Sequence, residues 1–246
     1  MNRFCIVVLG LLSMMVVPSW AQSDVFFVPD PQTAVWTYRE TNHETGAVSL
    51  SQYTVQTMIG DAVQGLAKVQ VKTTSLNAAA PADSTNLYFR FEQGECILDV
   101  GKMFSADLYE DALENTDDWK NLSDEERARV LKEMDDYVSV KGEVRGIPRY
   151  PQVGRLPDYE LKVKVLVMSV KIKGKSRKIT GVETISTPAG DYECFVMTEE
   201  VSAKMMLMTE KSVIKTWYAY GIGMVKQETY VDDQLESSLI LDTINW

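Results

Sequence analysis

The chain has 246 residues, a formal net charge of −10 and an apolar content of 45%. This length suits one domain or at most two, and the apolar content supports a sizeable core, so disorder and a fibrous class are excluded. An acidic chain without a separate lysine- or arginine-rich cluster is repelled by nucleic acid and by anionic lipid headgroups. With a single histidine, His43, and three cysteines, the chain also lacks the side chains of most catalytic zinc sites, zinc ribbons and iron–sulfur clusters.

The first 21 residues have the pattern of a secretory signal. A short basic start precedes an apolar run, Phe4–Val17, and then the small-residue sequence Pro18-Ser19-Trp20-Ala21. The run is shorter than the roughly 20 residues that span a bilayer, which disfavours the alternative of an uncleaved anchor. Because Cys5 lies at the start of the apolar run and not at its end, the sequence has no lipobox. We expect cleavage after Ala21 and a periplasmic or secreted product, residues 22–246, that forms a single β-rich domain without a transmembrane segment.

The remainder of the chain is dominated by alternating apolar and polar residues, with many β-branched and aromatic side chains. Turn-forming sequences separate these stretches. They predict about a dozen strands in an antiparallel meander, which is compatible with a sandwich, a barrel or a curved sheet. The predicted strands begin near Thr33 and continue over Val48–Ile59, Leu66–Leu76, Leu87–Phe91, Val138–Val144, Leu161–Ile172, Lys178–Ser186, Tyr192–Val201, Lys204–Tyr218, Met224–Tyr230 and Leu235–Ile244.

An acidic insertion, residues 106–137, separates the two β-rich halves. Its segment Asp107–Asp136 contains twelve acidic and four basic residues, a net charge of −8. Ser123 and Glu126 have the spacing of a capping box, and apolar residues follow at helical spacing, so we expect an amphipathic helix over residues 124–137. A short helical turn is expected earlier, around Tyr109–Leu113. The acidic residues do not follow the spacing of a calcium-binding loop.

Two stretches are apolar on both faces of a predicted strand. In Leu161–Ile172 the apolar residues change from odd to even positions, which indicates either a bulge or a strand covered on both sides. Met205–Met208 is likewise apolar throughout. Core packing explains both, and the alternative is a cavity for an apolar ligand. The candidate lining residues of that cavity are Met168, Met206, Met208 and Trp217.

Cys96 and Cys194 are the only cysteines after the signal. Both lie in alternating stretches typical of sheet positions. Export would place them where disulfides persist, so they form either a bridge or two separate buried thiols.

No recognised catalytic motif is present, and no residue is assigned to catalysis, to a cofactor or to a metal. His43 lies in a turn-like segment, which disfavours a Ser/His/Asp triad. The adjacent pairs Glu199-Glu200 and Asp232-Asp233 are expected to point to opposite faces of a strand or to lie in turns. A carboxylate-based hydrolase is therefore only the third hypothesis for function.

The second half of the chain carries a recognisable arrangement of motifs. It contains Thr187-Pro188-Ala189-Gly190-Asp191-Tyr192-Glu193-Cys194-Phe195, then Trp217-Tyr218-Ala219, then Gly221-Ile222-Gly223-Met224-Val225. The arrangement resembles the TapB-like exported bacterial proteins, which are related to domain-of-unknown-function family 3108. The resemblance implies a fold of the lipoprotein-carrier type: a strongly curved antiparallel sheet, or half-barrel, wrapped around helical insertions. It brings no catalytic residue with it.

These features favour a non-enzymatic periplasmic binding or carrier-like protein. In this hypothesis the curved sheet holds the helix of residues 124–137 in its concavity and accepts an apolar ligand or a partner segment beside it. The alternative is a structural or interaction component of an envelope assembly that docks through a sheet edge or through the acidic insertion.

Overall fold

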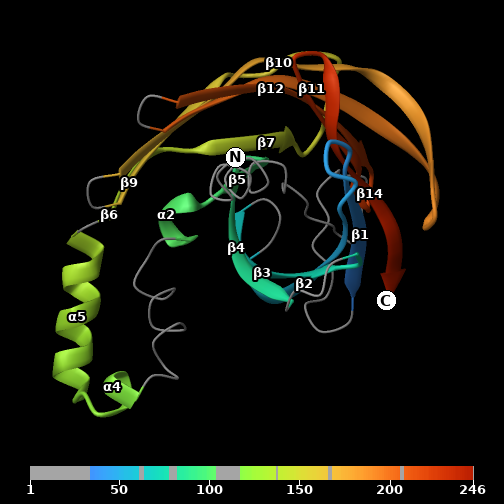
Figure 1. Ribbon diagram of the computed structural model, residues 1–246. Coiled ribbons are helices and arrows are strands. Elements are labelled where there is room, and N and C mark those ends of the chain that lie inside the picture. The colour runs from blue at the N-terminus through green and yellow to red at the C-terminus, as the bar shows by residue number, and fades with distance from the viewer. Residues whose placement is uncertain are drawn as a thin grey trace.

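The computed structural model describes residues 34–60, 64–77, 82–103, 117–136, 138–165, 168–205 and 208–245. The described chain folds around one 14-stranded antiparallel sheet, which curls until it nearly closes on itself (Figure 1). This confirms the predicted fold class of a strongly curved antiparallel sheet with a helical insertion. The predicted signal at residues 1–21 and the helical turn at Tyr109–Leu113 lie outside the described residues.

Neighbouring strands follow the order β6-β9-β10-β11-β12-β13-β14-β1-β2-β3-β4-β5-β7, and β8 pairs separately with β10. Most connections are hairpins between strands adjacent in sequence, as a meander requires. The strands are β1 Val35–Asn42, β2 Val48–Gly60, β3 Gln64–Ser75, β4 Asp83–Glu92, β5 Glu95–Leu98, β6 Val138–Gly142, β7 Val144–Pro148, β8 Gly154–Arg155, β9 Tyr159–Val165, β10 Met168–Thr187, β11 Gly190–Met205, β12 Met208–Ala219, β13 Gly223–Val231 and β14 Gln234–Asn245.

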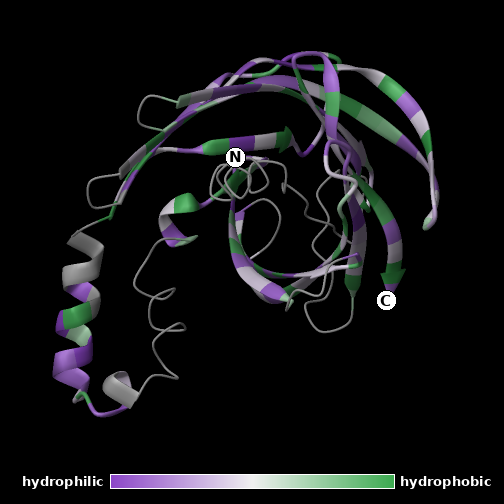
Figure 2. Cartoon of the chain, viewed as in Figure 1, coloured by the Kyte–Doolittle hydropathy of each residue, from purple (hydrophilic) through white to green (hydrophobic). Residues whose placement is uncertain are grey.

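The side of the sheet that faces the enclosed space, here called the inner face, carries the main core. Trp36 and Tyr38 of β1, Phe89 of β4 and Leu161 of β9 belong to a single buried cluster that joins both halves of the chain. Hydrophobic and hydrophilic residues alternate along the strands (Figure 2). Because successive side chains of a strand point to opposite faces, the remaining side chains lie on the outer face. One tightly packed core therefore holds the two halves together as one unit.

Two stretches predicted as single strands are hairpins. Leu161–Ile172 divides into the end of β9 and the start of β10, with Val165 paired to Met168. Lys204–Tyr218 divides in the same way, with Met205 of β11 paired to Met208 of β12. The apparent change of face in the sequence therefore marks a chain reversal, not a bulge or a strand covered on both sides. Both chain reversals lie in apolar sequence without the glycine, proline, asparagine or aspartate that usually indicates a turn, so the sequence did not predict them.

Three short or medium helices lie in the described residues: α2 Val100–Met103, α4 Asp117–Lys120 and α5 Asp124–Asp136. The capping box that begins α5 is confirmed, because the Ser123 amide donates to Glu126 Oε2 at 2.9 Å and the Glu126 amide donates to Ser123 Oγ at 3.3 Å. The expected position of this helix is wrong, since α5 stands beside β6 at the end of the sheet, outside the concavity (Figure 1). The much shorter α2 contributes buried Val100 and Met103 to the core instead.

A buried arginine connects strand β10 to the terminal strand β7. Arg177 of β10 donates hydrogen bonds to the carbonyl oxygens of Arg145 and Gly146, at 2.5 and 2.8 Å, both on the terminal strand β7. It also donates to the carbonyl oxygen of Pro157 at 2.7 Å and to Glu199 Oε2 at 3.1 Å. The guanidinium group thus provides hydrogen-bond donors to backbone carbonyl groups of β7, the terminal strand, which among the described strands pairs only with β5.

Candidate anion-binding face

Four lysines on the outer face form one continuous row across four neighbouring strands. Strand register places Lys141 of β6 opposite Lys162 of β9, Lys162 opposite Lys171 of β10, and Lys171 opposite Lys204 of β11. Directly opposed residues have their Cβ atoms about 4.5–5.5 Å apart, and like charges at this separation destabilise a sheet. This lysine row is therefore an arrangement that folding alone does not favour, and an anion placed over it would relieve its repulsion.

More lysines surround the row on the same face. With the row they make up a surface that we call the lysine face: Lys141, Lys162, Lys164, Lys171, Lys173, Lys175, Lys204 and Lys211. Among these, Lys171 and Lys173 are the ones that form ion pairs within the described residues. Their ammonium groups lie 2.7 and 3.2 Å from the carboxylate of Glu160. Hydrogen bonds from Lys171 and then from Lys173 hold the pKa of Glu160 below its usual range.

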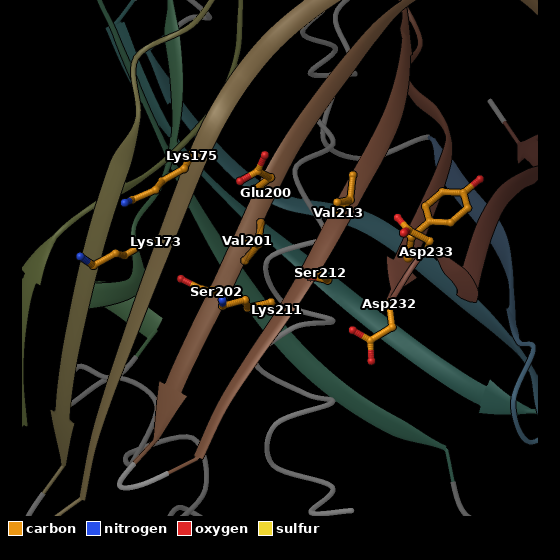
Figure 3. Close-up of a pocket in the computed structure, with 11 residues that line it drawn as sticks. Lys173, Lys175, Glu200, Val201, Ser202, Lys211, Ser212, Val213, Asp232 and Asp233 are labelled. Atoms are coloured by element: carbon orange, nitrogen blue, oxygen red, sulfur yellow. The ribbon is translucent and has the colours of Figure 1, made fainter.

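A pocket of about 530 Å³ lies at one side of the lysine face (Figure 3). Lysines line one part of it, and carboxylates from the β13–β14 turn line another. It is bordered by Lys173, Lys175, Glu200, Val201, Ser202, Lys211, Ser212, Val213, Tyr230, Asp232 and Asp233.

Two rows of directly opposed residues organise the pocket. In the first, Ser202 of β11 lies between Lys173 of β10 and Lys211 of β12. In the second row Glu200 lies between Lys175 and Val213, and Val213 faces Tyr230. The first row concentrates positive charge around one hydroxyl group.

Tyr230 contributes its ring to the pocket, while its hydroxyl group is engaged elsewhere. The hydroxyl donates to Glu228 Oε2 at 2.5 Å, and this hydrogen bond raises the pKa of Tyr230 to about 12. The tyrosine therefore stays neutral at physiological pH and is held in place beside the carboxylates of Asp232 and Asp233. Those two residues have φ values of 48° and 61°, as expected for the central residues of a tight hairpin turn.

The apolar-ligand residues predicted from sequence do not come together. Met208 begins β12 and is 52% exposed, whereas Trp217 lies nine residues further along the same strand and is 3% exposed. Nine residues place them about 30 Å apart and on opposite faces. Met206 lies outside the described residues, and of Met168 only the backbone is described. A shared lining that includes both Met208 and Trp217 is therefore contradicted.

Trp217 belongs to a small cluster on the outer face together with Cys194. Its indole N–H donates to Glu183 Oε2 at 2.8 Å, and the ammonium groups of Lys215 and Lys226 lie 4.4 and 4.7 Å from its ring centroid. Hydrogen bonding from Trp217 lowers the pKa of Glu183. These contacts hold Trp217 and Cys194, two residues of the motifs in the second half of the chain, in fixed positions.

Cys96 and Cys194 are free in the structure, so the possible disulfide between them is not formed. Cys96 lies in the main core on the inner face, and Cys194 lies in the separate cluster around Trp217. Burial raises the pKa of both thiols, to about 12 for Cys194.

The remaining candidates for chemistry are dispersed. His43 is exposed and its Nε2 lies 2.9 Å from Ser238 Oγ. Glu199 and Glu200 do point to opposite faces: Glu199 is buried beside Arg177, and Glu200 is exposed. Within the described ranges, no group of three or more His, Cys, Asp and Glu side chains is arranged to hold a metal ion.

The lysine face was missed at the level of sequence because the net charge was averaged over the chain. The signal is present, since Lys162 and Lys164 alternate with valine, and Lys171, Lys173 and Lys175 follow at the same spacing of two. This spacing puts all lysines of one strand on one face. The conclusion that no basic cluster offsets the acidic charge is therefore wrong for this surface.

Two solved structures of bacterial proteins are similar to this fold. A "putative lipoprotein" from Parabacteroides distasonis superimposes with a TM-score of 0.60 over 92% of this chain and 100% of its own, at 17% identity. A "putative exported protein with YmcC-like fold" from Bacteroides fragilis gives a TM-score of 0.55 over 86% of this chain and 94% of its own, at 19% identity. At these identities the likeness establishes a shared architecture, a strongly curved antiparallel sheet.

The family follows from the sequence match. Residues 116–241 match the DUF3108-like family, and since this range covers more than half of the chain, the protein belongs to that family. The relation inferred from the second-half motifs is thereby confirmed. No curated protein matches the chain.

Proposed function

We propose that this protein is an exported, non-catalytic binding protein that docks through its lysine face onto an anionic lipid surface. The observation that carries the proposal is the lysine row, in which Lys141, Lys162, Lys171 and Lys204 oppose one another without interruption. Such a row is costly in the isolated protein and favourable against a layer of negative charge.

The shape of the lysine face supports a surface as the partner. Four adjacent strands spread the row over about 14 Å, and positions Lys171 to Lys175 extend it by about 13 Å along β10. The charges therefore form a two-dimensional patch. Each basic residue near an anionic membrane contributes about 1 kcal/mol.

Export supports the same proposal. The first 21 residues have the pattern of a secretory signal, and proteins with this fold are described as lipoprotein or exported. In the described part of the chain no helix has both the length and the apolar character needed to cross a bilayer. Association with a membrane through this part is therefore proposed to be peripheral.

Vesicle sedimentation tests the proposal. The processed protein is mixed with vesicles of phosphatidylcholine alone or with 30% phosphatidylglycerol, at low and at high salt. We expect binding to the anionic vesicles that weakens as salt rises. The double substitution Lys162→Gln and Lys171→Gln should weaken it about 30-fold, because each lysine contributes about 1 kcal/mol.

Lys72→Gln is the control, and it is matched in charge to the single substitution Lys162→Gln, which is measured beside the double variant. Lys72 is an exposed lysine on β3, away from the lysine face, so its loss changes the net charge without changing the face. Equal binding to both vesicle types, or equal losses in the control and the double variant, would refute the proposal.

An apolar ligand in the concavity fits the described residues less well. The inner-face side chains of both halves pack against one another in a single cluster, including Tyr38, Val144 and Met224. Native mass spectrometry separates the two functions: a lipid retained by the envelope-purified protein after a high-salt wash would favour the enclosed apolar ligand, since salt removes electrostatically docked lipid.

A further inference from the structure

We infer that the pocket beside the lysine face binds one phosphate ester group between Lys173 and Lys211, over the hydroxyl of Ser202. The inference rests on the proposed function and specifies the chemical group that the face recognises. A phosphate ester presents several acceptor oxygens, and the ligand would be a headgroup ester that also carries hydroxyl or amine groups.

Strand register brings the required donors together. Ser202 lies directly opposite both Lys173 and Lys211, so each lysine Cβ is about 5 Å from the serine Cβ, on either side of it. The three side chains are therefore neighbours on one face, and both flexible lysine chains can reach an anion over the Ser202 hydroxyl, while Lys173 holds its ammonium group 3.2 Å from Glu160 on the other side. Lys175 follows two residues after Lys173 on the same face and adds a third positive charge.

The ion pairs of the face leave these donors available. Lys211 and Lys175 form no ion pair within the described residues, and Lys173 shares Glu160 with Lys171 at 3.2 Å from its ammonium nitrogen. An ammonium group has three N–H donors, so Lys173 can hold Glu160 and a phosphate oxygen together.

The opposite wall limits what can be attached to the phosphate. Asp232 and Asp233 of the β13–β14 turn present carboxylates to the pocket, and Glu200 presents a third beside Lys175 (Figure 3). A second anionic group on the ligand would be repelled there, whereas hydroxyl or amine groups could donate to these carboxylates. The pocket of about 530 Å³ has room for a phosphate and such a substituent. Glycerol phosphate, the headgroup of phosphatidylglycerol, has this chemistry.

The test compares a pocket variant with a row variant. The processed protein, Lys211→Gln and Lys204→Gln are each titrated with glycerol phosphate by calorimetry, and each is sedimented with phosphatidylglycerol vesicles. Lys204 is an exposed lysine of the row that does not border the pocket, so the two substitutions are matched in charge. We expect saturable one-to-one binding of glycerol phosphate that Lys211→Gln weakens at least tenfold and Lys204→Gln changes less than twofold.

Further variants and a competition experiment complete the test. Lys211→Arg should restore binding, which excludes a folding defect as the cause of the loss, and Ser202→Ala should weaken it severalfold. Excess glycerol phosphate should release wild-type protein from vesicles if the occupant is a lipid headgroup. Retention on the vesicles despite saturation of the pocket would identify a free phosphate ester as the occupant.

The possible failures are distinguishable. Vesicle binding without glycerol phosphate binding, with Lys211→Gln and Lys204→Gln equally impaired, would overturn the phosphate site and leave the docking function intact. Binding of glycerol phosphate that depends on Lys211, without any vesicle binding, would overturn the docking function and leave the phosphate site intact.

Discussion

Arg177 and Glu199 form an ion pair in the interior of the sheet, with 3.1 Å between Nε and Oε2 and side chains that are 1% and 7% exposed. The Arg177 guanidinium also stacks on the Tyr159 ring, 5.0 Å from its centroid, and Tyr159 hydrogen bonds to Glu199. The charge of Arg177 is compensated by Glu199, while its remaining N–H groups bind the backbone carbonyls of Arg145 and Gly146 in β7 and of Pro157. The ion pair therefore holds Arg177 in the position from which it binds β7.

Replacing Arg177 should destabilise the fold strongly. Arg177→Met leaves Glu199 buried without its partner and removes the donors to β7, so we expect a loss of about 3–5 kcal/mol in the free energy of unfolding, measured by urea denaturation. Lys178→Met is the control, because the neighbouring Lys178 is exposed. In the double variant Arg177→Met, Glu199→Leu no charge remains buried, and part of the loss should be recovered. A loss below 1 kcal/mol for Arg177→Met would contradict this account.

Glu199 should make stability depend on pH. Burial raises the pKa of Glu199 above its ordinary value of 4.5, and Arg177 opposes this only in part. The folded protein therefore holds the Glu199 proton more tightly than the unfolded chain, and this contribution to stability is lost as pH rises from 4.5 through the raised pKa. The free energy of unfolding of Glu199→Gln, relative to the wild type, should increase over that range.

The matched control for this pH experiment is Glu160→Gln. The pKa of Glu160 is lowered by Lys171 and Lys173, so its contribution is present above 4.5 and disappears only as pH falls through the lowered pKa. Urea denaturation between pH 3 and pH 8 separates the two windows. Parallel pH curves for the wild type and Glu199→Gln above pH 4.5 would be inconsistent with the raised pKa.

Two glycines of β10 should differ in their response to alanine: Gly174→Ala should destabilise the fold, and Gly181→Ala should have little effect. A Cβ on Gly174 would lie 2.3 Å from Tyr159 Cε1, because the Tyr159 ring covers the glycine across the strand pair, whereas a Cβ on Gly181 has no neighbour within 4 Å. We expect Gly174→Ala to cost about 1–3 kcal/mol through overpacking, and Gly181→Ala to change stability by less than about 0.5 kcal/mol. Thermal denaturation of both variants tests this, and equal effects would show that Tyr159 moves freely.

Both cysteines should be unreactive in the folded protein. Cys96 and Cys194 are 3% and 0% exposed, and burial keeps their thiols protonated. Titration of the processed, unreduced protein with a thiol reagent should detect no thiol in native buffer and two thiols in denaturant. Detection of none in denaturant would indicate a disulfide, contrary to the structure.

Reversing one charge in the lysine row should stabilise the protein while impairing docking. Lys162→Glu places a carboxylate between Lys141 and Lys171, so two repulsive contacts become attractive, and we expect a gain of about 0.2–1 kcal/mol at low salt. The same variant should lose binding to anionic vesicles. A loss of stability would show that the row is not under electrostatic strain in the folded protein.

Local patterns in the chain were sufficient to predict the mainly β class, the antiparallel meander and the start of α5. The Ser123 and Glu126 capping box and the turn before Gly190 are short-range interactions, so a few neighbouring residues encode them. The motifs of the second half also led to the correct family. These features share one property: the interactions that define them join residues close together in sequence.

The candidate site depended on long-range pairing that no local pattern encodes. The hairpin between Val165 and Met168 sets the register that places Lys162 opposite Lys171. The pairing of β10 with β11, which includes two register shifts, places Lys171 opposite Lys204. Arg177 likewise reaches β7 only because the sheet curls round on itself. The spacing of residues along one strand showed which of them share a face. The contacts between strands are set by the tertiary packing of the core. That packing decides the lysine row, the contact of Arg177 with β7 and the pocket.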